Sequence, residues 1–163
     1  MKTGEKALGV LIVLLLCVGV GRVLLAPAEK DKESGSIPFY SSASAEVQNR
    51  AAVLYKDLKC RDCHRLWGVN NIMQFVPSPS LDGVGSLRDE AWLYEYFSSE
   101  NPQEMLPTRL KKEFKMPSYA TLSEKDRRLM AAYFSSLKVK DWYLDEVKRM
   151  EQEKLTGKKA NES

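Results

Sequence analysis

The sequence Cys60-Arg61-Asp62-Cys63-His64 constrains this chain more than any other stretch. Two cysteines three positions apart, with a histidine directly after them, form the motif through which haem is attached covalently to protein. Each thiol adds across a vinyl group, and the histidine ligates the iron from one haem face. His64 is the only histidine in the chain, and Cys60 and Cys63 are the only cysteines outside an apolar stretch near the N-terminus. The motif and this inventory predict one covalent haem c, with its iron, per chain.

Three other uses of these cysteines compete with haem attachment. Structural zinc takes four Cys or His ligands, and this region offers three. A thioredoxin-like dithiol needs a strand–helix context, whereas the surrounding sequence has a helical pattern. A disulfide between Cys60 and Cys63 would close too short a loop to stabilise much. A non-haem dithiol protein therefore remains an alternative, and the absence of covalent haem would support it.

The first 26 residues predict a transmembrane anchor. Residues 7–26 are apolar except for Arg22. Twenty helical residues at about 1.5 Å each reach the ~30 Å needed to cross a bilayer. Lys2 and Lys6 favour a cytoplasmic N-terminus. The alternative is a cleaved signal peptide, because Ala26-Pro27-Ala28 has the small-x-small form of a cleavage site.

Both interpretations place the remainder of the chain outside the cytoplasm. An uncleaved anchor predicts a single-pass protein of a bacterial inner membrane with its domain in the periplasm, and cleavage predicts a soluble periplasmic protein. Residues 27–44 mix alternating charges with Ser, Gly and Pro, which is typical of a flexible linker.

Helical patterns dominate residues 45–138. Three helix starts are indicated: the N-cap Ser44, the capping pair Ser86-x-x-Asp89, and the capping pair Ser123-x-x-Asp126. No stretch has a convincing strand pattern. We expect an all-α domain of about three or four helices around one covalent haem. The apolar positions at helical spacing, expected to form the core, are Val47, Ala51, Leu54, Tyr55, Leu58, Trp92, Leu93, Tyr96, Phe97, Met130, Tyr133, Phe134 and Leu137.

Two further segments have no simple role in such a core. Residues 67–85 are punctuated by glycines and prolines, and a long loop of this kind usually wraps or serves a site. We expect it to cover the histidine side of the haem. Residues 139–163 predict a C-terminal helical extension, in which Tyr143, Val147 and Met150 share one face, followed by a frayed tail.

Residues 45–137 resemble the class I c-type cytochromes. The resemblance rests on the helix before the haem motif, the Pro79-Ser80-Leu81 step in the loop, the aromatic middle helix, and Met116-Pro117-x-Tyr119 followed by a capped helix. Ser78 stands where the family commonly has glycine before the loop proline. The resemblance implies that the Pro79 carbonyl accepts a hydrogen bond from the His64 ring and orients it.

The resemblance also implies a methionine as the second axial ligand. The residues agree, because a chain with one histidine cannot ligate its iron with two. Met116, fixed by Pro117, is the main candidate, and Met105 is the lesser one. Met73 and Met130 are expected to pack in the interior. A vacant sixth position is the alternative. His64/Met116 ligation would raise the reduction potential and leave no open site on the iron.

These features predict a monohaem electron carrier rather than an enzyme. It would move single electrons from a quinol-oxidising complex or another cytochrome to a terminal oxidase or reductase. The formal net charge of +3 is small, so nucleic acid is not indicated. A basic cluster just before the proposed methionine ligand could steer an acidic redox partner. Its members are Arg109, Lys111, Lys112 and Lys115.

Two alternative functions remain open. The order of anchor, linker, haem motif, Met-Pro segment and short tail also resembles the small haem subunit of bacterial nitric oxide reductase. This chain could therefore be a fixed haem c subunit of such a reductase or of a quinol-oxidising complex. A haem gas sensor or peroxidase with an open iron site is the less favoured alternative.

Overall fold

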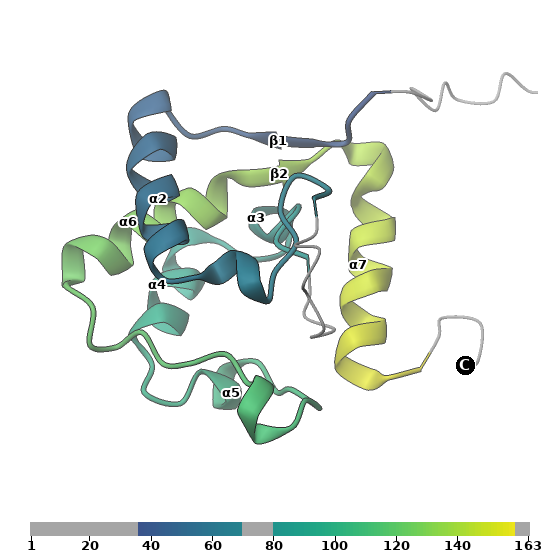
Figure 1. The fold of residues 1–163 in the computed structure, drawn as a ribbon. Coiled ribbons are helices and arrows are strands. Elements are labelled where there is room, and N and C mark those ends of the chain that lie inside the picture. Colours follow the sequence, from purple (N-terminus) through teal and green to yellow (C-terminus); the bar gives the residue numbers. More distant parts are fainter. Residues whose placement is uncertain (1–35, 70–79, 159–163) are drawn as a thin grey trace, which may run out of the picture. The chain divides into compact units, whose positions relative to one another are not determined.

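The computed structural model describes residues 36–69 and 80–158 (Figure 1). The described elements, in chain order, are β1 (Phe39–Ser41), α2 (Ala45–Asp57), the 3₁₀ turn η1 (Cys60–Asp62), α3 (Val84–Leu87), α4 (Glu90–Ser98), α5 (Pro102–Met105), the 3₁₀ turn η2 (Lys112–Phe114), α6 (Glu124–Ser136), β2 (Leu137–Val139) and α7 (Asp141–Thr156). The fold is mostly helical, as predicted, but the described part of residues 45–138 has five helices where three or four were expected, because α3 and α5 are four-residue helices too short to show a period in sequence. Residues 1–26, for which the membrane anchor is predicted, and Pro79 lie outside the described residues.

Two of the predicted helix starts are confirmed at the atomic level. The Ser44 side chain accepts a hydrogen bond from the Val47 backbone N–H, 3.3 Å away, and α2 begins at the next residue. The Ser123 side chain accepts from the Asp126 backbone N–H at 3.1 Å and starts α6. These side chains satisfy donors that the first turn of a helix leaves without a backbone partner.

The third start signal was misassigned. Helix α4 begins at Glu90, and its N-cap is Asp89, whose carboxylate accepts from the Trp92 N–H at 2.8 Å. Ser86 instead belongs to the short helix α3, and its hydroxyl accepts from the Val139 N–H at 3.1 Å. Both residues are good caps, so local sequence could not decide which of them begins the helix.

Helices α2, α4 and α6 pack together and form the core. All of the apolar positions predicted for the core are buried or half-buried there. Phe134 of α6 lies at its centre, with ring centroids 6.5 Å from Tyr55 of α2 and 5.5 Å from Phe97 of α4. Met130 and Leu137 are the largest side chains that are completely buried. The three helices thus form the packed body of the domain, and the segments that contain the haem motif and Met116 lie against it.

The expectation that the chain has no strand is wrong. β1 and β2 pair antiparallel, with Phe39 opposite Val139 and Ser41 opposite Leu137. The pairing lengthens through hydrogen bonds from Ser42 N–H to the Ser136 carbonyl, at 3.0 Å, and from Lys140 N–H to the Pro38 carbonyl, at 2.9 Å. Three-residue strands are too short to show an alternating pattern in sequence. Their pairing holds β1 beside the end of α6 and directs the chain into α7 (Figure 1).

None of the helices among residues 36–69 and 80–158 is long and apolar enough to cross a membrane.

Candidate haem site

The haem motif forms a tight turn directly after α2. Lys59 adopts a left-handed conformation, with φ of 54°, and ends the helical path. The chain then continues as η1, in which the His64 N–H donates to the Cys60 carbonyl at 2.9 Å. Cys60 is buried, Cys63 is half-buried, and the two are not joined by a disulfide. Cys60, Cys63 and His64, which are close in sequence, therefore reach one side of the core, and no disulfide joins the two thiols.

These residues line a large cleft with two adjoining compartments. The compartments have volumes of about 380 and 680 Å³. Cys60, His64, Tyr96, Met116 and Tyr119 line both of them, and Cys63 lines the larger one. Cofactor sites typically have volumes of ~300–1,000 Å³ and mainly apolar walls with a few placed polar groups. The cleft satisfies both conditions, and its back wall includes Leu93, Phe97, Met130 and Phe134 of the core.

Met116 lies in the same cleft as His64, although 52 positions separate them in sequence. The Tyr96 hydroxyl donates to the Met116 sulfur, 3.2 Å away, and Gln103 Nε2 donates to the Met116 carbonyl at 3.2 Å. Burial raises the pKa of Tyr96 to about 12, so its phenol keeps its proton at neutral pH and remains a donor. Side chain and backbone of Met116 are thus both held by α4 and α5.

The other methionines occupy different places. Met105 packs against the core and lines neither compartment, whereas Met130 is buried in the wall of the smaller one. Met73 lies outside the described residues. Met150 of α7 also lines the smaller compartment, a position that sequence reasoning missed. Its only signal in the sequence was the apolar face shared with Tyr143 and Val147.

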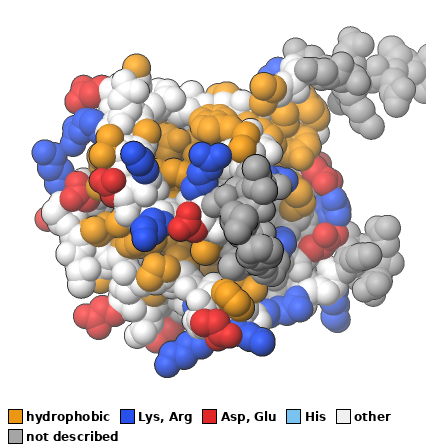
Figure 2. Space-filling view, in the orientation of Figure 1, with side chains coloured by type: hydrophobic (Ala, Val, Ile, Leu, Met, Phe, Trp, Pro, Cys, Tyr) orange, Lys and Arg blue, Asp and Glu red, His pale blue; other side chains and the backbone are white. Residues whose placement is uncertain are grey.

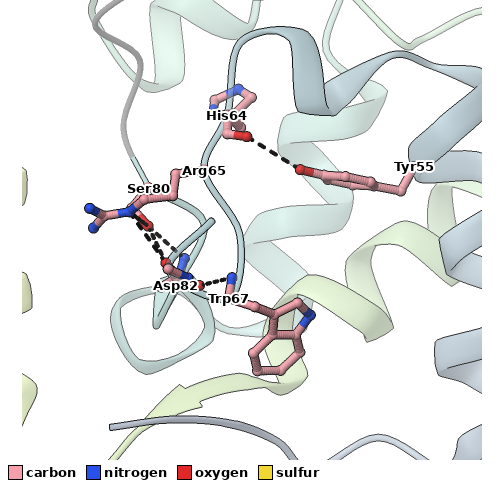
Figure 3. Close-up of polar contacts among 7 residues, drawn as sticks. Tyr55, His64, Arg65, Trp67, Ser80 and Asp82 are labelled. Atoms are coloured by element: carbon pink, nitrogen blue, oxygen red, sulfur yellow. Dashed lines mark hydrogen bonds and ion pairs between the residues drawn. The ribbon is translucent and has the colours of Figure 1, made fainter. Parts of the chain in front are cut away.

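The segment after His64 is held by a buried carboxylate. Asp82, only 4% exposed, accepts hydrogen bonds from the backbone N–H groups of Trp67 and Gly68, the latter at 3.0 Å. It also accepts from the Ser80 hydroxyl at 2.8 Å and lies 3.5 Å from Arg65 Nε. Figure 3 shows the His64 ring directed away from this cluster, while its backbone carbonyl faces the Tyr55 hydroxyl. Asp82 was not identified from the sequence, because acidic residues in a glycine-rich loop are usually exposed.

The environment of Cys60 disfavours dithiol redox chemistry. Burial raises the pKa of the Cys60 thiol to about 11. A catalytic dithiol needs a lowered pKa, because the thiolate is the reacting species. Within residues 36–69 and 80–158, no group of three or more His, Cys, Asp or Glu side chains is arranged to hold a metal ion. The donor set of two cysteines that form no disulfide, one histidine and one methionine in an apolar cleft fits a covalent haem.

Comparison with known proteins agrees with this geometry. The family model for Cytochrome c matches residues 48–138, which is more than half of the chain. The matched range begins in α2 and ends in β2, so it contains the haem motif, Asp82 and Met116, whereas all of α7 lies outside it. No curated protein and no solved structure matches the chain. The chain belongs to the cytochrome c family: it carries haem c with its iron, bound covalently, and it serves electron transfer.

Proposed function

We propose that this cytochrome is a membrane-anchored, monohaem electron carrier whose iron is ligated by His64 and Met116. Cys60 and Cys63 form the two thioether bonds, and the Pro79 carbonyl orients the His64 ring. The haem supplies a one-electron couple, and an iron saturated by two protein ligands passes electrons without binding substrate. The protein is thus an electron-transfer protein and not itself an enzyme.

One observation carries this proposal. His64 and Met116 line the same two compartments of one cleft, and the Met116 sulfur is fixed by the Tyr96 hydroxyl. A methionine that served only packing would not need a hydrogen bond to its sulfur, which is a weak acceptor. The bond instead suits a thioether that must be kept in one orientation.

The test uses the full-length protein, matured by a host that attaches haem to such motifs. Visible spectra of the oxidised and reduced forms are recorded with and without carbon monoxide, for wild type, Met116→Ala and the control Met105→Ala. Wild type and control should be low-spin and unaffected by carbon monoxide, because both axial positions are filled. Met116→Ala should become high-spin and bind the gas. Binding of carbon monoxide by wild type would contradict the proposal and favour a gas sensor or peroxidase.

The location is proposed from the apolar residues 7–26, preceded by Lys2 and Lys6. The protein should remain with bacterial inner membranes after an alkaline carbonate wash, and added protease should cut the haem domain in spheroplasts but not in intact cells. Recovery of a soluble periplasmic form that begins near Ala28 would instead show that the segment is a cleaved signal peptide.

A fixed haem subunit of a larger membrane oxidoreductase is the second candidate. It is favoured by large apolar side chains exposed near the N-terminal strand and at the start of α7. Ile37 is 72% exposed and Trp142 44%. Purification in mild detergent distinguishes the two candidates. A stable complex with an integral membrane partner favours the subunit, and a monodisperse single chain favours the free carrier.

A further inference from the structure

Helix α7 lies outside the range matched by the Cytochrome c family model, yet it lines the cleft. Val147, Met150, Glu151, Glu153 and Lys154 line the smaller compartment, and Glu151, Glu153, Lys154 and Leu155 line the larger one. Val147, Met150, Glu151 and Lys154 follow one another at i, i+3, i+4 and i+7 and share one face of the helix, and Glu153 stands at the edge of that face. The opposite face, which includes Lys148 and Gln152, is exposed. One face of α7 therefore lines the haem cleft, and the other is exposed.

Two contacts hold the first half of α7 in this position. Near its start, the Tyr143 ring meets Phe39 of β1 edge to face, with centroids 5.5 Å apart. In its middle, Val147 is only 5% exposed and packs beside Gly83. Gly83 has a φ of +82°, and a Cβ built on it would be in ordinary contact with the Val147 methyl groups, at 3.5 Å, but only 2.5 Å from Val139 Cγ1 of β2. Glycine is therefore required here by the left-handed backbone and by the approach of β2.

Two contacts hold the second half of α7. Glu151 forms an ion pair of 2.8 Å with Arg88, the residue that ends α3. At the other end, the Arg109 guanidinium lies against Gly157, the residue that caps α7. Arg109 belongs to the segment that leads to Met116 and lines the larger compartment. Figure 1 shows α7 extending along the side of the domain from the β1–β2 end toward the level of α5.

We propose that α7 is an additional wall of the haem site, in which Val147 and Met150 keep water from the haem and thereby raise its reduction potential. The inference rests on the haem position proposed above. Water stabilises the oxidised haem, which carries more charge, so an apolar wall favours the reduced form. The two acidic side chains of α7 that line the cleft each have a cationic partner: Arg88 pairs with Glu151, and Arg149, which also pairs with Glu146, pairs with Glu153.

Met150→Gln tests the proposal, because it replaces the apolar thioether by a polar side chain of similar length. The reciprocal variant Gln152→Met, on the exposed face of the same helix, is the matched control. A chain that ends at Lys140 removes the whole helix. Each protein is prepared with haem attached and equilibrated with the same redox mediator. The ratio of reduced to oxidised haem is measured, and carbon monoxide binding is the second readout.

Met150→Gln should shift the equilibrium toward the oxidised form two- to fivefold, and Gln152→Met should leave it unchanged. Removal of α7 should shift it about tenfold, which for one electron is about 59 mV. All three proteins should remain unaffected by carbon monoxide, because the ligands are untouched. The point variants decide the question if the shortened chain does not fold.

Two results would overturn the inference. An unchanged equilibrium for Met150→Gln means that α7 does not shape the haem environment. Carbon monoxide binding by Met150→Gln means that Met150 is an axial ligand and not part of a wall. Failure of the ligation proposal is recognised separately. It would appear as carbon monoxide binding by wild type, or as an unchanged spectrum in Met116→Ala. The equilibrium with the mediator can be measured in either case, because it requires only that haem is attached.

Discussion

At the scale of single residues, the bond from Tyr96 to Met116 connects the core to the proposed ligand. A hydrogen bond to the thioether withdraws electron density from sulfur and favours the reduced iron. Tyr96→Phe should therefore make reduction of the iron less favourable by up to about 1 kcal/mol, the typical net contribution of a hydrogen bond, and so lower the reduction potential. Redox titration measures this shift. Tyr94→Phe is the control, because Tyr94 lies on the same helix and lines neither compartment. An unchanged or higher potential in Tyr96→Phe would contradict the argument.

Asp82 is the second residue whose role can be tested. Its carboxylate accepts from two backbone N–H groups and one hydroxyl and pairs with Arg65. Asp82→Asn places an amide group among these donors and removes the partner of a half-buried guanidinium. The free energy of unfolding should fall by about 3 kcal/mol, as expected when a buried charged network is broken. Denaturant titration measures the loss, and the exposed Asp57→Asn should lose little.

At the scale of elements, the packing of α3 on α6 depends on Gly85. A Cβ built on this residue would lie 2.7 Å from the Phe134 carbonyl oxygen and closer still to Ser135. The obstacle is helix backbone, which cannot move aside. Gly85→Ala should therefore lower the free energy of unfolding by about 3 kcal/mol, the upper range for overpacking. Thermal unfolding checks this value. Gly68→Ala should cost only about 1 kcal/mol, because its left-handed backbone is the only obstacle there.

The elements also differ in how well the sequence predicted them. Helices α2 and α6 follow directly from their caps and apolar periods, because both signals are local. The start of α4 was misplaced because Ser86 and Asp89 are equally suitable caps, and only the contact of Ser86 with Val139 distinguishes them. Strands β1 and β2 were missed because a three-residue pair is stabilised by its partner and not by a pattern of its own.

At the scale of the whole molecule, positive and negative side chains are mixed over the surface, apart from the basic cluster before Met116. The face in Figure 2 carries lysine, arginine and acidic side chains interspersed, so no single sign dominates it. The basic cluster predicted from the sequence is exposed, and two of its members, Arg109 and Lys115, line the larger compartment. Such a cluster should attract anionic reagents to the haem edge over about one Debye length.

Lys115→Glu should slow oxidation of the reduced protein by ferricyanide roughly two- to fivefold at low salt. The difference from wild type should vanish at high salt, because screening removes long-range attraction. Stopped-flow absorbance gives both rates. Lys125→Glu on α6 is the control, since this exposed residue lines neither compartment. Equal slowing in both variants would mean that net charge matters and the cluster does not.

The sequence by itself determined the chemistry of this protein. A haem motif, a single histidine and a Met-Pro segment require no knowledge of the fold, because thioether formation and iron ligation depend on residue type and short spacing. The tertiary structure alone decided that His64 and Met116 line one cleft, that Asp82 is buried against the backbone of Trp67 and Gly68, and that α7 lines part of that cleft. These depend on contacts between residues far apart in the chain, and such contacts leave no periodic signal in sequence.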